Sequence, residues 1–174
     1  LKLKMHKLES FMKSVAKNKD NKVIKVGFIV QLEVLWDKQE PVFAEMNKNS
    51  DFEVKLLVVP KTDWSNLNKF DNYDNNFFLR KYPKEAIKVL DEHNNLCNIK
   101  DFNFDYVFFP RPYDTHLPKG LRSTDLVKIT RCCYIPYGYS LSDNFNDCNV
   151  DNSFFDNIYM EFTESKYIQS LLYQ

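Results

Sequence analysis

The segment 102–141 constrains the fold more than any other part of the chain, because its pattern is that of a crossover between two strands. Residues 106–109 (YVFF) and 132–135 (CCYI) are short apolar runs, each closed by a proline, as expected for strands buried on both faces. Prolines hold the intervening loop extended, and Ser123 is a candidate N-cap for a short helix that runs to Thr130. Strand, loop, helix and strand in this order predict two parallel strands in one sheet.

The chain before this crossover continues the alternation of strands and helices. Apolar runs at 23–32 and 52–59 predict two further buried strands, with a helix over 37–47 between them. Residues 61–79 are polar and predicted to form a long loop, and residues 82–94 have the spacing of an amphipathic helix. Together these elements predict an α/β fold, a three-layer Rossmann-like domain with a mainly parallel sheet of about four strands.

The chain divides into a short basic segment and one segment of domain size. Residues 1–22 carry seven lysines against one glutamate and one aspartate, and apolar side chains recur at helical spacing. This predicts a basic amphipathic leader or linker helix, which either attaches to an anionic membrane surface or partner, or packs on its own domain. Residues 23–174 are expected to form the Rossmann-like domain, mostly helical over 153–174. Because the chain starts without methionine and its last predicted helix continues to the end, we expect a fragment of a longer two-domain protein.

Several classes of protein are disfavoured by composition and motifs. The formal net charge of zero gives no electrostatic reason to bind nucleic acid. No glycine-rich turn follows the first strand and no P-loop is present, so we expect no cofactor. The cysteines form no CxxC pair, and Cys132 and Cys133 should face opposite sides of one strand, which argues against a metal site or a disulfide framework. Without a membrane-spanning run or a signal peptide, the protein is expected to be cytoplasmic, with peripheral contact at the inner membrane face as a role open to residues 1–22.

Polar motifs follow two of the predicted strands. The motif PRPYD occupies 110–114 and the motif PYGYS occupies 136–140. Because the carboxyl ends of parallel strands face one crevice, we expect both motifs to line a single site. The candidate binding residues are Arg111, Tyr113, Asp114, Tyr137, Gly138 and Tyr139.

Each of these residues also has a structural interpretation. Arg111 can hold a phosphate through two donors and Asp114 can bind a hydroxyl, or the two can pair across the turn. The tyrosines can present hydroxyls and flat faces to a polyol or sugar, or they can close the core at the strand ends. Gly138 is expected to supply a backbone conformation that other residues cannot adopt.

Asp37 follows the first strand and is the catalytic candidate. It can act as a general base toward an attacking hydroxyl or cap the first helix, and the two roles are compatible. Trp36 is expected to pack in the core and His116 to be exposed to solvent. Lys61 and Asp63, after the second strand, are weaker candidates at the same edge.

Five segments, taken in order, resemble a known family. They read VLWDKQEPVFAEM, FEVKLLVVP, DYVFFPRPYD, CYIPYGYSL and FTESKY. Their order and spacing are similar to those of the amino-terminal domain of the CDP-glycerol glycerophosphotransferase family, the teichoic acid polymerases and related capsule enzymes. The resemblance spans roughly residues 23–170. The chain departs from the family at Arg111, where relatives commonly have asparagine, and in the loop PKTD after the second strand, so the acceptor stays open.

The resemblance implies one half of a GT-B transferase with two Rossmann-like domains. Such enzymes transfer glycerol phosphate, or a related polyol or sugar phosphate, from a CDP-activated donor to a growing polymer. This chain would supply the acceptor side of the cleft, and a second domain would carry the nucleotide contacts and the catalytic histidines. Alone, the chain should bind a polyol-phosphate or saccharide acceptor weakly and catalyse nothing, because the transfer needs groups on both sides of the cleft.

The residues by themselves also fit a free-standing α/β module that binds a small ligand or regulates a partner. The third strand ends in Phe-Phe-Pro without an aspartate at its tip, which disfavours a phosphorylated receiver domain. No phosphate loop rich in serine and threonine follows the first strand, which disfavours a flavodoxin. A sensor of small ligands therefore stands as the alternative function.

Overall fold

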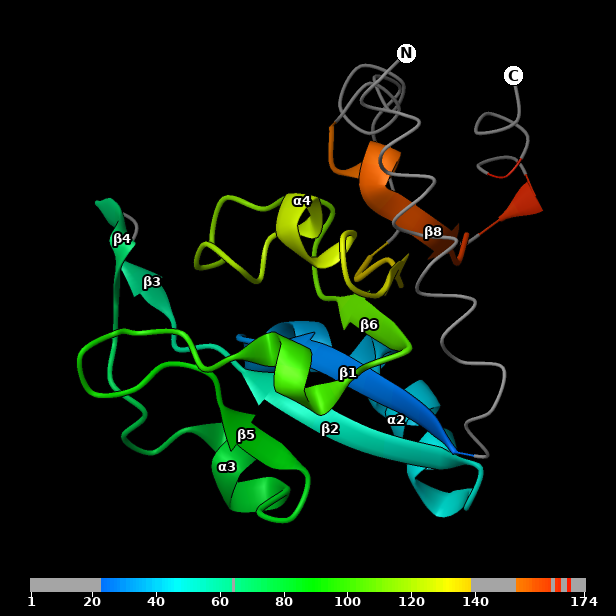
Figure 1. The fold of residues 1–174 in the computed structure, drawn as a ribbon, viewed down its shortest axis with the longest axis horizontal. Helices are drawn as coiled ribbons and strands as arrows, with labels where there is room; N and C mark the ends of the chain where they lie inside the picture. Colours follow the sequence, from blue (N-terminus) through cyan, green and yellow to red (C-terminus); the bar gives the residue numbers. More distant parts are fainter. Residues whose placement is uncertain (1–22, 64, 139–152, 164, 167–168, 170–174) are drawn as a thin grey trace.

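The computed structural model describes residues 23–63, 65–138, 153–163, 165–166 and 169, and within them six strands form one sheet (Figure 1). Every neighbouring pair in this sheet is parallel. The spatial order is β5-β2-β1-β6-β7-β8, which along the chain reads 3-2-1-4-5-6, the order of a doubly wound, Rossmann-like sheet. The strands are β1 (Ile24–Val30), β2 (Phe52–Val58), β5 (Ala86–Lys88), β6 (Tyr106–Phe109), β7 (Arg131–Tyr134) and β8 (Ile158–Glu161).

One face of the sheet is covered by the segments that follow β1 and β2. These are η1 (Glu33–Lys38), α2 (Glu40–Lys48) and α3 (Phe77–Lys81). Their buried aromatic side chains pack against Phe28 of β1 and Phe108 of β6. Burial of several aromatic rings in edge-to-face contact fixes this layer firmly on the sheet.

The opposite face carries a second core. It is covered by η2 (Ile99–Phe102), α4 (Ser123–Leu126) and η4 (Phe155–Asn157). Strand residues alternate between the two cores, so Cys132 faces this layer while Cys133 faces the other, as predicted. Burial raises the pKa of the Cys133 thiol to about 12, so the thiol stays protonated.

The predicted α/β class, the three layers and the parallel crossover from β6 to β7 are confirmed, but the sheet has six strands instead of about four. One of the added strands lies where a helix was expected, at 82–94. That prediction is wrong: Ala86–Lys88 pairs with β2 as β5, and the chain then turns at 91–95. The Asp91 side chain accepts hydrogen bonds from the backbone N–H groups of His93 and Asn95, and this local turn outcompetes the helix.

The prediction of a mostly helical segment over 153–174 is wrong for its first part. Phe155–Asn157 forms a single short turn, η4, and Ile158–Glu161 then joins the edge of the sheet as β8. Edge pairing with β7 satisfies the backbone of a segment whose apolar spacing also suits a helix. Residues 170–174, like residues 1–22 with their predicted basic helix, lie outside the described part of the chain.

Three further boundaries differ from the prediction. The first helix, α2, begins at Glu40 and not at position 37, because residues 33–38 form the separate turn η1. The expected loop 61–79 contains a hairpin, β3 (Thr62–Asp63) with β4 (Asn66–Phe70), and then α3. The helix predicted to run to Thr130 ends as α4 at Leu126 and continues as turns. Within the described residues no helix is long and apolar enough to cross a membrane.

Candidate functional site

The direction of chain winding reverses between β1 and β6, two neighbouring strands at the centre of the sheet. In doubly wound sheets, ligands bind outside the carboxyl ends of the strands at this reversal. Gln31 follows β1 directly, and Arg111 follows β6 after one proline. The sequence and the strand order therefore place both side chains at the position where a site is expected.

Gln31 joins the ends of three strands. Its side chain is buried, at 3% exposed, and its Nε2 donates to the backbone oxygens of Pro60 (2.8 Å) and His116 (3.2 Å). The same nitrogen lies 3.1 Å from Thr62 Oγ1, and Oε1 accepts a hydrogen bond from Arg111 Nη2. The two hydrogens of this amide are shared among three nearby acceptors, and a buried amide has to be satisfied, so this one side chain ties together the loops after β1, β2 and β6.

Arg111 is a buried cation, only 5% exposed, that has no carboxylate partner among the described residues. Its guanidinium contacts the Gln31 amide and lies 5.5 Å from the centre of the Tyr113 ring. In the described part of the chain, the only buried side-chain N or O atom without a hydrogen-bond partner is Thr130 Oγ1, so the remaining Arg111 nitrogens keep contact with solvent. A guanidinium held by neutral groups, with donors left open, suits an anion.

The two predicted motifs meet at Tyr113 and Tyr137. Partial burial raises the pKa of the Tyr137 hydroxyl, as does the proximity of Tyr113, while the charge of Arg111 lowers it. Tyr137 is 40% exposed and Tyr113 is half-buried, so both rings are accessible to solvent at this edge of the sheet. The expected convergence of the loops after β6 and β7 is therefore confirmed as far as residue 138, and Tyr139 lies outside the described residues.

His116 is the residue of this region whose environment was predicted wrongly. It was expected to be exposed, but it is 7% exposed and its ring lies 5.9 Å from that of Tyr113. Burial lowers the pKa of its imidazole, and the positive charge of Arg111 lowers it further. Gln31, Arg111, Tyr113, His116 and Tyr137 are called the rim cluster below.

The stability of the protein should depend on pH through His116. Its pKa in the folded protein lies below the ordinary value of 6.5, so below pH 6.5 the unfolded chain binds a proton that the folded protein resists. The free energy of unfolding should fall as the pH drops through this window, and His116→Gln should remove that part of the dependence. Urea unfolding of both proteins above and below pH 6.5 measures the difference. An unchanged pH dependence in His116→Gln would contradict the assignment.

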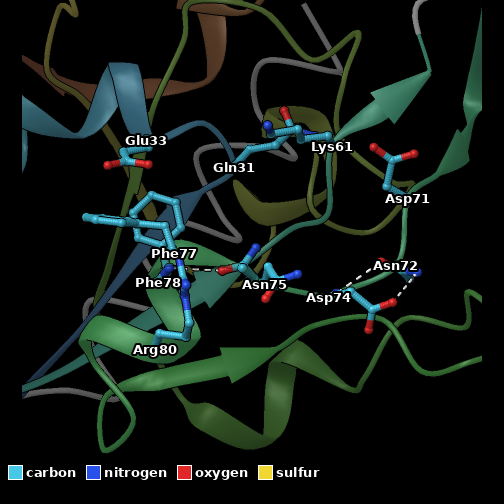
Figure 2. A pocket seen from close by; sticks show the side chains of 11 residues that line it. Gln31, Glu33, Lys61, Asp71, Asn72, Asp74, Asn75, Phe77, Phe78 and Arg80 are labelled. Atoms are coloured by element: carbon cyan, nitrogen blue, oxygen red, sulfur yellow. Dashed lines mark hydrogen bonds between the residues drawn. The ribbon is translucent and has the colours of Figure 1, made fainter.

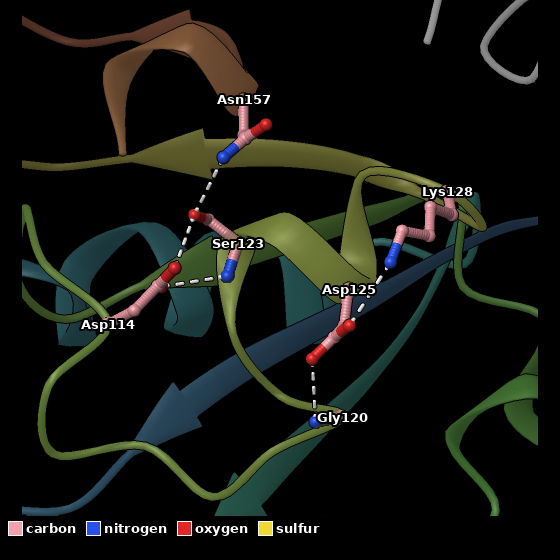
Figure 3. Close-up of polar contacts among 6 residues, drawn as sticks. All are labelled: Asp114, Gly120, Ser123, Asp125, Lys128 and Asn157. Atoms are coloured by element: carbon pink, nitrogen blue, oxygen red, sulfur yellow. Dashed lines mark hydrogen bonds and ion pairs between the residues drawn. The ribbon is translucent and has the colours of Figure 1, made fainter. Parts of the chain in front are cut away.

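Asp114 has a structural role at the start of α4. Its two carboxylate oxygens accept hydrogen bonds from the backbone N–H and the Oγ of Ser123, both at 2.7 Å (Figure 3). Asn157 donates to the same Oγ from η4, at 3.1 Å. Asp114 therefore caps the first turn of α4, and the alternative interpretation, in which it pairs with Arg111 across the turn, does not hold. Each of its oxygens accepts one hydrogen bond and can accept another, so the binding of a hydroxyl by Asp114 stays a prediction.

Asp37 lies on η1, at the same edge of the sheet, with a side chain 67% exposed. Its carboxylate is 3.6 Å from Lys38 Nζ, and it caps neither η1 nor α2, so the capping interpretation is wrong. Gln39 stands at the N-cap position of α2, and its Nε2 donates to the backbone oxygen of Phe109 at 2.7 Å. Trp36 is buried in the core as predicted and donates to Tyr82 Oη.

The expectation for Gly138 is also wrong. Its φ lies outside the left-handed region, and a Cβ added there would meet no atom within 4 Å. Any residue can adopt this exposed backbone, so the glycine is not required by conformation. Gly120 is the glycine with a left-handed φ, of +96°, in the loop before α4.

A pocket of about 350 Å³ adjoins the rim cluster and is called the side pocket below (Figure 2). Gln31 and Lys61, from the ends of β1 and β2, form one wall. Glu33 of η1, residues 71–76 and the first turn of α3 complete it. Among the described residues no group of three or more histidine, cysteine and acidic side chains is placed to hold a metal ion.

The comparisons with protein-family models, with curated proteins and with solved structures found no match for this chain. The site is therefore defined by its geometry. Sequence reasoning missed Gln31 and the side pocket. The available signal for Gln31 was a polar residue directly after an apolar run of strand length.

Proposed function

We propose that this chain is the acceptor-side half of a GT-B-type transferase that extends a polyol-phosphate polymer, as in the synthesis of teichoic acid or capsule. The acceptor, a polyol phosphate or saccharide chain, would bind at the rim cluster. A CDP-activated donor would be held by a second domain. Two features support the proposal: the resemblance of residues 23–170 to such amino-terminal domains, and a sheet whose strand order is that of Rossmann-like domains.

The main support for an anionic acceptor is the environment of the Arg111 guanidinium. Its guanidinium is buried at the reversal point of the sheet without a carboxylate among the described residues. Holding a buried charge against neutral groups alone costs free energy, and a phosphate that reaches its open donors would offset that cost. Tyr113 and Tyr137 can then offer hydroxyls to the polyol next to the phosphate.

Asp37 is the proposed base for the attacking hydroxyl. It is exposed on η1 at the carboxyl edge, so the second domain would have to exclude water from it before it could act efficiently. In this proposal residues 1–22, outside the described part, would provide peripheral contact with the cytoplasmic membrane face.

Replacement of Arg111 by methionine should lower the affinity for glycerol phosphate more than about tenfold, because the charge-assisted bonds are lost. Binding is measured by NMR titration of the isolated chain with glycerol phosphate and with glycerol. The matched control is Arg131→Met, at the amino end of β7, whose guanidinium lies 5.1 Å from the Tyr106 ring. In the wild type, the bound anion should also raise the pKa of His116, because it compensates the charge of Arg111.

Two results would count against this function. Equal affinity of the wild type and Arg111→Met for glycerol phosphate would exclude the rim cluster as the anion site. Robust turnover of CDP-glycerol by the isolated chain would contradict the half-site, because stabilising the transferred phosphate needs groups from both sides of a cleft.

A free-standing small-ligand module is the second candidate. One observation favours it: a pocket of about 350 Å³ lies beside the rim cluster. The coding sequence after Gln174 distinguishes the two candidates. A second α/β domain there supports the transferase, and a stop codon supports the module.

A further inference from the structure

We propose that the side pocket binds a neutral polyhydroxylated molecule, a sugar or a polyol. The proposal goes beyond the proposed function and holds for either candidate, because it concerns a different set of side chains from those that would hold an anion. Only Gln31 belongs to both the side pocket and the rim cluster. The volume of about 350 Å³ lies within the range of small-molecule sites.

The walls of the side pocket are fixed before any ligand binds. Tyr73 anchors the middle of the 71–76 segment: its hydroxyl donates to the backbone oxygen of Val58 at 3.1 Å and accepts from the backbone N–H of Leu90 at 2.9 Å. Asn76 caps α3 by accepting hydrogen bonds from two backbone N–H groups of its first turn. A preformed wall lowers the entropy cost of binding.

Several polar side chains at the side pocket are left without a partner in the described part of the chain. These are Glu33, Lys61, Asp71, Asn75 and Arg80. In contrast, the neighbouring Asn72 and Asp74 are joined to each other, with Asn72 Nδ2 donating to Asp74 Oδ2 at 2.7 Å. The unpartnered groups are those available to a ligand, and they include both donors and acceptors.

The charges of these groups exclude a simple ion as the preferred ligand. They comprise two carboxylates, two cations and one amide, so neither sign dominates. A hydroxyl group both donates and accepts, and so it can bond to carboxylates, amides and cations alike. A molecule with several hydroxyls matches this mixture without placing a net charge beside charges of its own sign.

An aromatic ring supplies the apolar contact that a sugar or polyol needs. Figure 2 shows Phe77 and Glu33 on one side of the pocket and Asp71 and Asp74 on the other. The Phe77 ring is held edge-to-face by Phe78, with a distance of 5.2 Å between the ring centres. The C–H groups of a polyol can pack on such a ring while its hydroxyls reach the polar wall opposite.

The test is an NMR titration of the amide resonances with glycerol, ribitol, glucose and N-acetylglucosamine, and separately with inorganic phosphate. We expect at least one neutral compound to shift the resonances of Gln31, Lys61 and residues 71–80 at millimolar concentration. Asp71→Ala and Phe77→Leu should each weaken this binding about tenfold, because one removes a hydroxyl acceptor and the other removes the ring. The matched control is Asp51→Ala, an exposed aspartate just before the amino end of β2.

The outcomes separate this proposal from the proposed function. Shifts in the side pocket with a neutral compound, retained in Arg111→Met, support it. No shift with any of the four neutral compounds would overturn it, as would an equal loss of binding in Asp51→Ala. Shifts in the side pocket caused by phosphate alone would also overturn it, since they would define an anion site. If glycerol phosphate does not bind at the rim cluster, that result would instead count only against the proposed transferase function.

Discussion

Asp114→Ala is expected to lower the free energy of unfolding by about 3 kcal/mol, the sum of a lost helix cap and of a buried hydroxyl left without its acceptor. The carboxylate caps α4 through the backbone of Ser123 and also accepts from its hydroxyl, to which Asn157 donates. Ser123 and Asn157 are both buried, so water does not replace the lost bonds. Urea unfolding followed by circular dichroism measures the loss.

Asp125→Ala is the matched control for this prediction. Asp125 lies on the same short helix, accepts from the backbone N–H of Gly120 at 2.9 Å and lies 3.2 Å from Lys128 Nζ, but it is partly exposed (Figure 3). We expect a loss of about 1 kcal/mol, because water and the flexible lysine recover part of the interaction. If Asp125→Ala lowers the free energy of unfolding as much as Asp114→Ala does, the hydrogen bonds among Asp114, Ser123 and Asn157 stabilise the protein no more than a partly exposed contact does.

Gln31→Met is expected to destabilise the protein by roughly 3 kcal/mol, because it removes a buried amide that serves several partners and leaves Arg111 without its hydrogen bond. Methionine has a similar length, so the change leaves little cavity. The backbone oxygens of Pro60 and His116 lose their shared donor at the same time.

A double-mutant cycle with Arg111→Met measures the direct contact between the two side chains. In the Gln31→Met background, Arg111→Met should lower the free energy of unfolding less than it does in the wild type, or should raise it. We expect a coupling free energy of about 1 to 2 kcal/mol. Additive effects of the two substitutions would mean that Gln31 acts only through the backbone.

The parts of the fold that the sequence predicted correctly are those with an unambiguous apolar pattern. The strands around Val26, Leu56 and Val107 are buried on both faces, so their composition alone distinguishes them from surface helices. Around Ala86 and Tyr159 the apolar spacing suits a helix as well as a strand. These two segments form strands because they pair with β2 and β7, which are distant in the sequence. The local sequence pattern does not indicate such a pairing.

In the candidate site, too, some features follow from the sequence pattern and others depend on contacts between distant segments. The gathering of Arg111, Tyr113 and Tyr137 follows from the rule that parallel strands end at one edge, and it was predicted. The capping role of Asp114 and the burial of His116 depend on how the loop 110–122 folds back over the sheet. The side pocket depends on Tyr73 reaching β2, a contact that spacing along the chain does not reveal.

The hydrogen bond between Gln31 and Arg111 joins residues 80 positions apart, and the same separation divides Lys25 from Asp105 at the other end of the two strands. Closing a loop of this length costs entropy before any contact compensates it, so high contact order slows this step relative to the pairing of β1 with β2. The rim cluster is therefore expected to assemble late in folding. A ligand at this position would recognise only chains whose central strands have already come together.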